Sequence, residues 1–405
     1  MTGKHWLRIG GTLMVGLFVA YLDRINLSVA LPSLSRELGF TGSRFAITSS
    51  WALTTFLVGY AGANIFGGVF TRWADPKWIV IIMLVVWSIA TLLTGFVGSL
   101  FTLLVMRAIL GIAEGVYWPQ QSRFAKAWFA PHELTRANTM IQYYGQYIAL
   151  AIGFFILTPV YDALGWRYLF YITAFLGMFI TLPLFWIMLR KESEAPYISK
   201  SQVSNHKITL KSLGGKPIFF LVFSNLTQAM LFWGVTLWLP MVVKSLGYSG
   251  FKQGLGSALP YLTAVILAVP MSYISDKTGK RLLFATLGLI IPGSLMILLP
   301  FVDSGLLKLI IICAAMGYGA SNYTPNFWTI LQSNVEPASI GPAAGILNGI
   351  AAGGGGTLAG FIVGILLKST GSYMPGFMVL GFLIILGGLS MMLYGKFTRK
   401  AVKLS

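Results

Sequence analysis

The chain of 405 residues is poor in the side chains that most enzymes and metal sites use. It has one cysteine, three histidines and only 11 acidic residues. Cys313 alone excludes an internal disulfide and a cysteine-based metal site. His5, His132 and His206 are widely separated and fall in polar segments, so they form no metal-binding cluster. We also find no Ser-His-Asp set and no nucleotide-binding loop, and therefore expect neither an enzyme nor a cofactor-binding protein.

Charge is scarce as well, because only 10% of the residues are charged and 56% are hydrophobic. Globular proteins carry roughly 25% charged residues. Apolar runs of about 20 residues, the length that crosses a bilayer, recur along the whole chain. The sequence therefore predicts an all-α integral membrane protein with twelve transmembrane helices, at 9–31, 45–70, 78–98, 101–121, 137–160, 168–189, 217–243, 252–274, 282–301, 306–331, 340–367 and 373–395.

The longest polar stretch, residues 191–216, has no apolar periodicity and contains Ser, Asn, Gly and Pro, which is typical of a linker. It separates an N-terminal half, residues 1–190, from a C-terminal half, residues 217–405, with six predicted helices in each. Equal halves joined by a cytoplasmic loop indicate an internal repeat, with a binding site between the halves near the midplane of the membrane.

The net charge of +18 is unevenly distributed. If the helices alternate in direction, most of the 29 lysines and arginines fall on the side of the membrane that holds both termini. This asymmetry follows the positive-inside rule and predicts cytoplasmic termini in a cell membrane, plasma or inner. The partner of the surplus charge is then the anionic lipid surface rather than nucleic acid.

Four ionisable residues interrupt the apolar spans: Asp23 and Arg24 in the first, Arg107 and Glu114 in the fourth. A charge at membrane depth costs from about 2.5 to over 10 kcal/mol, so such residues usually mark a transport pathway. Arg107 and Glu114 share a helical face, and Gly111 between them lets another helix approach closely. We expect Arg24 to face a cavity and Asp23 to face a neighbour such as Arg107. The alternative is that these residues form ion pairs that only hold helices together.

The charge balance of these residues suggests a mechanism. With all four ionised, the site sums to zero, and an entering organic anion leaves it with one negative charge. An uncompensated charge in a cavity of low dielectric constant is costly. Protonation of Asp23 or Glu114 restores neutrality, so anion binding and proton binding favour each other. Arginine suits the anion because its planar guanidinium stays charged and binds a carboxylate with two hydrogen bonds.

Neutral polar side chains in other spans could complete the site. Each of them could equally form a hydrogen bond between helices. These candidates are Tyr60, Asn64, Gln146, Tyr147, Asn225, Gln228, Asn322, Tyr323, Asn326, Trp328 and Asn348.

Several motifs resemble those of a known family. The segment Tyr21–Ala30, with the pattern Tyr-x-Asp-Arg-x-Asn-Leu-Ser-x-Ala, resembles the first-helix signature of the anion:cation symporter family within the major facilitator superfamily. Arg107–Pro119 resembles its fourth-helix signature, and Trp128–Glu133 is similar to the loop that follows. Ser275–Arg281 resembles the acidic-basic loop between the second and third helices of each half; the first-half copy, Gly67–Lys77, departs from that pattern. The family includes sialin, the vesicular glutamate carriers and bacterial sugar-acid symporters.

The resemblance implies a role for each site residue. Arg24 would hold the substrate anion, Asp23 and Glu114 would carry protons, and Arg107 would pair with Asp23 or relay charge. Four further residues match positions that line the site in sugar-acid members: Tyr21, Tyr60, Gln146 and Asn348. No metal takes part in this scheme.

The implied function is proton-coupled symport of a small organic anion, such as a sugar acid or another carboxylate, by alternating access. The expected partners are the anion, protons and the lipid bilayer, and we expect a monomer. The alternative on the same fold is an organic anion exchanger or a proton-driven efflux carrier. An exchanger of phosphate esters is disfavoured, because the only two buried arginines are both balanced by acids.

Overall fold

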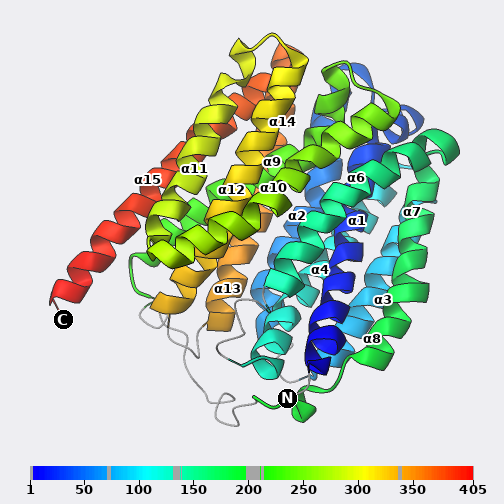
Figure 1. Ribbon diagram of the computed structural model, residues 1–405. Helices are drawn as coiled ribbons and strands as arrows, with labels where there is room; N and C mark the ends of the chain where they lie inside the picture. Colours follow the sequence, from blue (N-terminus) through cyan, green and yellow to red (C-terminus); the bar gives the residue numbers. More distant parts are fainter. Residues whose placement is uncertain are drawn as a thin grey trace.

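The computed structural model describes residues 3–70, 74–130, 137, 139–197, 210, 214–335 and 340–404, and within these ranges the chain is helical and has no strand (Figure 1). In lipid, a helix satisfies its own backbone hydrogen bonds, which explains why the apolar runs fold in this way. Ten helices in the described part of the chain are long and apolar enough to cross a membrane. With α2 (Phe45–Phe70) and α10 (Gly250–Thr278) they cover the twelve predicted spans, so the predicted all-α membrane architecture is confirmed.

All helices of the N-terminal half precede those of the C-terminal half along the chain. The N-terminal half contains η1 (Trp6–Gly11) and α1 (Thr12–Glu37), α2 (Phe45–Phe70), α3 (Pro76–Thr94), α4 (Leu100–Trp128), η3 (Thr139–Tyr144) and α6 (Gly145–Leu164), and the continuous run α7 (Trp166–Phe175), η4 (Leu176–Thr181) and α8 (Leu182–Met188). The C-terminal half contains α9 (Ile218–Ser245), α10 (Gly250–Thr278), α11 (Arg281–Leu298), α12 (Gly305–Asn334), the run α13 (Ile340–Asn348), η9 (Gly349–Gly355) and α14 (Gly356–Thr370), and α15 (Met374–Leu404).

The two helices outside the group of ten, α2 and α10, have 26 and 29 residues and are long enough to span. Both carry several Ser, Thr and Gly residues, and α10 also contains Pro260 and Pro270. Both pack against the opposite half of the molecule, α2 against η9 and α14, and α10 against α6. Small and weakly polar residues are common at such helix–helix interfaces in membranes.

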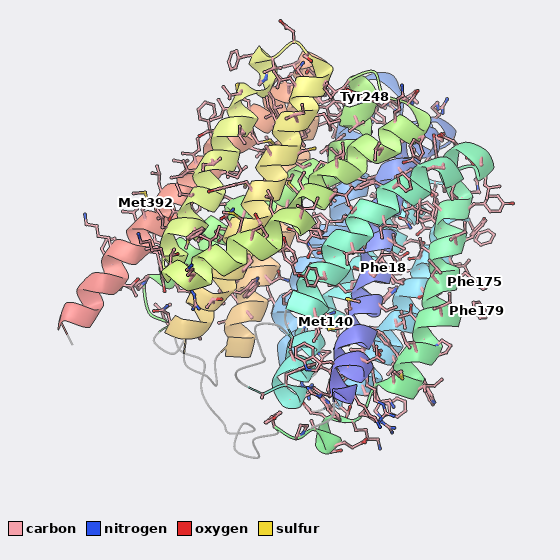
Figure 2. The ribbon with its side chains drawn as sticks, in the orientation of Figure 1. Phe18, Met140, Phe175, Phe179, Tyr248 and Met392 are labelled. Carbon is pink, nitrogen blue, oxygen red and sulfur yellow. The ribbon has the colours of Figure 1, made fainter. Side chains whose placement is uncertain are left out.

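Large apolar side chains cover the outside of the bundle. Phe175 and Phe179 project from the outer face of the α7–η4 run and are 55% and 68% exposed, and Met392 does the same on α15 (Figure 2). A soluble protein rarely exposes so many large hydrophobic side chains together. The surface is therefore one that faces lipid, as expected for a multi-pass membrane protein.

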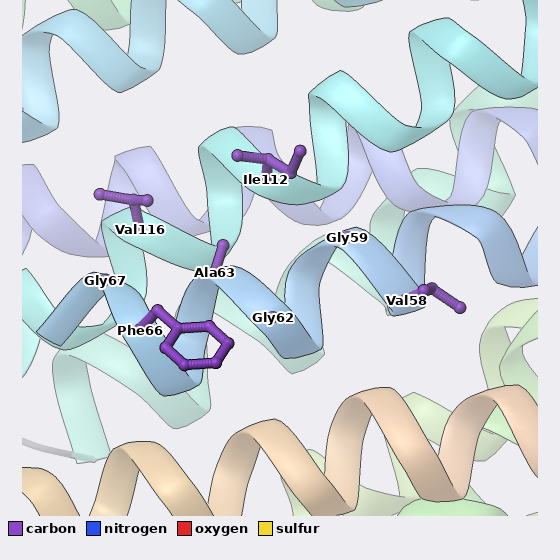
Figure 3. Close-up of a pocket in the computed structure, with 8 residues that line it drawn as sticks. All are labelled: Val58, Gly59, Gly62, Ala63, Phe66, Gly67, Ile112 and Val116. Carbon is purple, nitrogen blue, oxygen red and sulfur yellow. The ribbon is translucent and has the colours of Figure 1, made fainter.

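Within the N-terminal half, α4 lies directly against α2. A Cβ atom added at Gly111 would lie 2.1 Å from the main-chain oxygen of Phe56, and one at Gly115 would lie 2.7 Å from that of Tyr60. The predicted close approach at Gly111 is thus confirmed. On the outer face of this helix pair, a shallow apolar groove of about 430 Å³ is lined by Val58, Gly59, Gly62, Ala63, Phe66, Gly67, Ile112 and Val116 (Figure 3).

The two halves meet along a second line of glycines, which we call the glycine seam: Gly353, Gly360 and Gly364 of the C-terminal half. A Cβ atom at Gly353 would lie 2.0 Å from the Cβ of Ala61, and one at Gly364 would lie 1.8 Å from Oγ of Ser50. Along the seam, the backbones of η9 and α14 therefore lie in close contact with α2. Gly355 and Gly356, next to Gly353, also pack closely against neighbouring helices, and η9 is π-helical.

The first residues of the predicted linker dock onto the N-terminal half. Glu192 forms an ion pair with Arg123, and its main-chain N–H donates to Asp75 at 3.0 Å. Most of the linker lies outside the described residues, so the division at 191–216 stays a prediction. Pro131–Glu133 and the side chain of Asp276, from the two loop motifs, also lie outside the described part.

Candidate functional site

Arg24 of α1 and Glu114 of α4 form a buried ion pair. The Nε of Arg24 donates to Oε2 of Glu114 at 2.5 Å, and the two residues are 3% and 0% exposed. Because α4 packs so closely on α2, its acidic side chain reaches past α2 to α1. Arg107, on the same face of α4, also points to α1, so the shared face predicted for Arg107 and Glu114 is confirmed.

Four aromatic rings surround the guanidinium of Arg24. Its Cζ lies 4.1 Å from the ring centre of Tyr21 and 4.8 Å from that of Tyr60. Phe56 and Trp233 follow at 5.1 and 5.7 Å. Aromatic faces attract a cation, most strongly where water is excluded. Trp233 belongs to α9 of the C-terminal half and stacks on Tyr21 at 6.4 Å, which places the Arg24 cluster at the boundary between the halves.

Asn348 of α13 links the second half to this cluster. Its Nδ2 donates to the hydroxyl of Tyr60 at 3.3 Å and to Oδ1 of Asn64 at 3.2 Å. Asn64 in turn donates to the main-chain oxygen of Tyr60 at 3.2 Å. The hydrogen-bonded side-chain amides of Asn348 and Asn64 therefore connect the two halves. The ring of Tyr60 lies between this pair and Arg24.

The expected side-chain ion pair between Asp23 and Arg107 is wrong for this structure. Arg107 donates instead to the main-chain oxygen of Asp23 at 3.3 Å, and its guanidinium lies 5.2 Å from the ring centre of Phe56. These two contacts hold the guanidinium at the backbone of α1. Both carboxyl oxygens of Asp23 are buried without a hydrogen-bond partner among the described residues.

Gln146 of α6 is the predicted site residue least connected to the cluster. It is half-buried, and within the described ranges no hydrogen bond joins it to Arg24 or its neighbours. Other neutral candidates form contacts within the C-terminal half. Tyr323 bonds Ser224 at 2.9 Å, and Asn326 accepts from Ser275 at 2.5 Å. These two are interhelical hydrogen bonds, the alternative considered for such residues.

Sequence reasoning missed Phe56 and Trp233, although both rings face Arg24. No local signal distinguishes them, because aromatic residues make up 14% of the chain and occur throughout the apolar spans. Only the packing of α2 and α9 around α1 selects these two.

Comparisons with known proteins show which proteins the chain resembles. Residues 13–360 match the family model described as Major Facilitator Superfamily. The chain is 26% identical to the probable sulfoacetate transporter SauU of Cupriavidus necator, covering 94% of this chain and 91% of the relative. It is 25% identical to the D-galactonate transporter of Escherichia coli, covering 94% and 93%. The crystal structure of the nucleoside transporter NupG matches with a TM-score of 0.67 at 14% identity, over 95% of this chain and 99% of that one.

Proposed function

The chain belongs to the Major Facilitator Superfamily and is a membrane transporter, not an enzyme, and on that premise we propose that it carries a small organic anion together with protons. Sugar acids and other small carboxylates are the proposed substrates. The relatives named for sulfoacetate and D-galactonate support the anion class. The positive-inside distribution supports a cell membrane location with both termini cytoplasmic, and we propose a monomer as the working unit.

The observation that carries the proposal is the buried Arg24–Glu114 pair at the boundary between the halves. An arriving carboxylate binds Arg24 by displacing Glu114 from it. Glu114 then lies buried without its counter-ion, which is costly, and taking up a proton removes that cost. Anion and proton therefore favour each other's binding at one site.

The other charged groups near Glu114 fit this scheme. Among the described residues, Arg107 and Asp23 are the remaining acidic or basic side chains buried nearby, and with Arg24 and Glu114 they sum to zero charge. We assign Glu114 as the main proton carrier, Asp23 as a second acidic group, and Arg107 as the positive charge that balances it. Tyr21, Tyr60 and Asn348 would line the bound anion, and Gln146 would join them in a conformation that opens the site.

The position of the site supports alternating access. The Arg24 cluster has walls from both halves, and the glycine seam closes one end of the boundary near Ser50. Rocking of one half against the other around a fixed site would expose the anion to each side in turn.

Uptake into proteoliposomes tests the coupling. With radiolabelled sulfoacetate and D-galactonate as first probes, the wild-type protein should accumulate anion when the outside is more acidic. Glu114→Gln should still exchange external for internal anion but lose accumulation driven by the pH gradient. Glu37→Gln is the matched control, because Glu37 also pairs with an arginine, Arg167, but at the exposed rim.

If Glu114→Gln still concentrates the anion, the proton role assigned to Glu114 is wrong. Wild-type uptake that ignores the pH gradient and follows only the internal anion would identify an exchanger instead.

A further inference from the structure

The side of the molecule opposite the two termini, which we call the outer side, carries more positive charge than its topology requires. Its helix ends lie at the top of Figure 1, and Tyr248 marks the turn between α9 and α10 there in Figure 2. The structure describes ten charged residues at these ends, seven of them basic: Arg36, Glu37, Arg44, Asp162, Arg167, Lys244, Lys252, Asp303, Lys308 and Lys368. They sum to four positive charges. The positive-inside rule requires an excess of basic residues on the inner side and does not explain this surplus.

The surplus is concentrated where the two halves meet. Helices α1, α2 and α6 pack across the boundary against α9, α14 and α10, respectively. Five of these six helices carry an exposed basic residue at or beside the outer end, a set that we call the cationic mouth: Arg36, Arg44, Lys244, Lys252 and Lys368. Asp162, near the end of α6, offsets one of these charges. The other outer charges cancel, because Lys308 is balanced by Asp303 and Arg167 is paired with Glu37.

Two residues of the cationic mouth, one from each half, flank the outer end of the glycine seam. On α14, Lys368 lies one turn beyond Gly364 and on the same face, because residues four apart are neighbours on a helix surface. A Cβ atom at Gly364 would lie 3.1 Å from the main-chain oxygen of Ala46, and Arg44 precedes Ala46 by two residues at the start of α2. Both charges therefore stand where the outer boundary closes.

A second contact between the halves carries further members of the mouth. Phe251 of α10 packs against Phe155 of α6 with ring centres 5.0 Å apart, and Lys252 is the next residue of α10. At the end of α1, Arg36 donates to Oγ of Ser33 at 3.0 Å, so its guanidinium is held at the mouth without losing its charge. Among the described residues, no member of the mouth forms an ion pair with a carboxylate. Their field is therefore open to an anion from solution.

We propose that the cationic mouth captures small organic anions on the outer side and feeds them into the boundary that leads to Arg24. A cleft lined by charge of one sign between walls of low dielectric constant concentrates ions of the opposite sign and raises association rates by about 10- to 1,000-fold. The bilayer around the bundle provides such walls. Carboxylates and sulfonates gain from this field, and cations are repelled by it. Because the charges belong to both halves, they repel each other across the boundary, and an arriving anion removes that repulsion.

The cationic mouth rests on the proposed function for its ligand and adds the side from which the anion is taken. Transport from the outer side is uptake, because the termini lie on the inner side in the proposed topology. Charges at the rim of a site act on the rate of association and on its salt dependence. The kcat/KM of uptake should therefore fall as ionic strength rises, whereas kcat should change little.

The field of the mouth is measured without any transport by reagents of opposite charge. A cysteine at position 369, beside Lys368, is introduced into a Cys313→Ala background in proteoliposomes. The probes are a sulfonate-bearing and a trimethylammonium-bearing thiosulfonate. The ratio of their reaction rates should be at least about fivefold higher at position 369 than at Gly98→Cys, at low ionic strength. Gly98 is the reference because it is exposed on the outer side, in the turn between α3 and α4, with open space around its missing Cβ.

The salt dependence and the charge variants identify the origin of this ratio. The screening length falls from about 30 Å at 0.01 M salt to about 3 Å at 1 M, so the difference between the two positions should disappear in concentrated KCl. Replacing Lys244, Lys252 and Lys368 by glutamine together should also remove most of it. Lys308→Gln is the matched control, because it removes the same kind of charge from the outer end of α12, away from the mouth.

Uptake of radiolabelled sulfoacetate completes the test. The triple glutamine variant should lower kcat/KM at least about fivefold at 0.01 M salt and less than twofold at 1 M, and Lys308→Gln should lower neither. Equal reagent ratios at positions 369 and 98 would overturn the proposal, as would a kcat/KM that is insensitive to both salt and the triple variant. A wild-type protein that shows the reagent ratio but moves no organic anion keeps the charged surface and loses the proposed function. Anion transport without the ratio keeps the function and removes the mouth.

Discussion

The two halves of the molecule contribute different chemistry to the same boundary. In the described spans, the N-terminal half holds every buried acidic or basic side chain: Asp23, Arg24, Arg107 and Glu114. The C-terminal half supplies Trp233, Asn348 and the glycine seam, all uncharged. Charge is therefore concentrated in one half, and the other half covers it.

This division has a physical reason in an alternating-access transporter. A charged group on the moving surface would lose and regain its hydration in every cycle, at a cost of several kcal/mol per ion. In the proposed alternating-access cycle, keeping the charged side chains within one half lets them stay paired or protonated while the neutral half moves. Glycines on the surface of the C-terminal half permit a close contact, across which Ser50 donates one neutral hydrogen bond to the main-chain oxygen of Gly360 at 3.2 Å.

The largest effect should come from removing the charge that faces the boundary. Arg24→Ala should weaken anion binding by about 100-fold or more, because truncating one partner of a buried charge pair costs about 2–5 kcal/mol. Ligand-induced thermal shifts with sulfoacetate and D-galactonate measure this loss. Arg24→Lys keeps the charge but loses the planar fork, and should retain part of the affinity.

Loss of binding in Arg24→Ala has a trivial explanation if Glu114, left unpaired, unfolds the protein. The double variant Arg24→Ala with Glu114→Gln removes both charges, so it should recover thermal stability without recovering binding. Normal anion affinity in this folded double variant would show that recognition lies elsewhere.

Two glycines distinguish packing within a half from packing between halves. Gly111→Ala places a Cβ against the backbone of Phe56 within one half, where the contact is permanent. It should destabilise the fold by about 1–3 kcal/mol or more, seen as a lower Tm. Gly353→Ala places a Cβ against Ala61 across the boundary, where the clash is relieved when the halves separate. It should change the Tm little and favour the state in which the seam is open.

The opening is measured by labelling a cysteine at position 50, beside the seam, with a membrane-impermeant maleimide in a Cys313→Ala background. Gly353→Ala should label severalfold faster than its parent. Gly62→Ala is the control, because Gly62 lies on α2 with open space around its missing Cβ. Unchanged labelling in Gly353→Ala would mean that the seam is not a moving contact.

The contrast between charged and neutral residues also explains which parts of the site the sequence could predict. Asp23, Arg24, Arg107 and Glu114 are visible because charges stand out in apolar spans, and Gly111 because its spacing places it between two of them. The apolar runs likewise predict the helices, since their length is fixed by the bilayer.

The neutral contributions are far less visible in the sequence. Trp233 and Phe56 resemble any aromatic residue of an apolar span. Their importance arises only when α2 and α9 pack around α1. The expected Asp23–Arg107 pair failed for a related reason: helical periodicity places two side chains on facing surfaces, but it does not decide whether a guanidinium meets a carboxyl or a backbone oxygen.

The smallest effect should come from the amide that bridges the halves. Asn348→Ala removes the hydrogen bonds to Tyr60 and Asn64, and should weaken anion binding by roughly fivefold, or about 1 kcal/mol, as for a typical neutral hydrogen bond. Asn334→Ala is the control, because the side chain of Asn334 donates to the main-chain oxygen of Ile330 in its own helix. Titrating the anion against both variants compares them directly. A loss in Asn348→Ala as large as that in Arg24→Ala would place substrate recognition in both halves, and the charged half could no longer be regarded as the one that binds the anion.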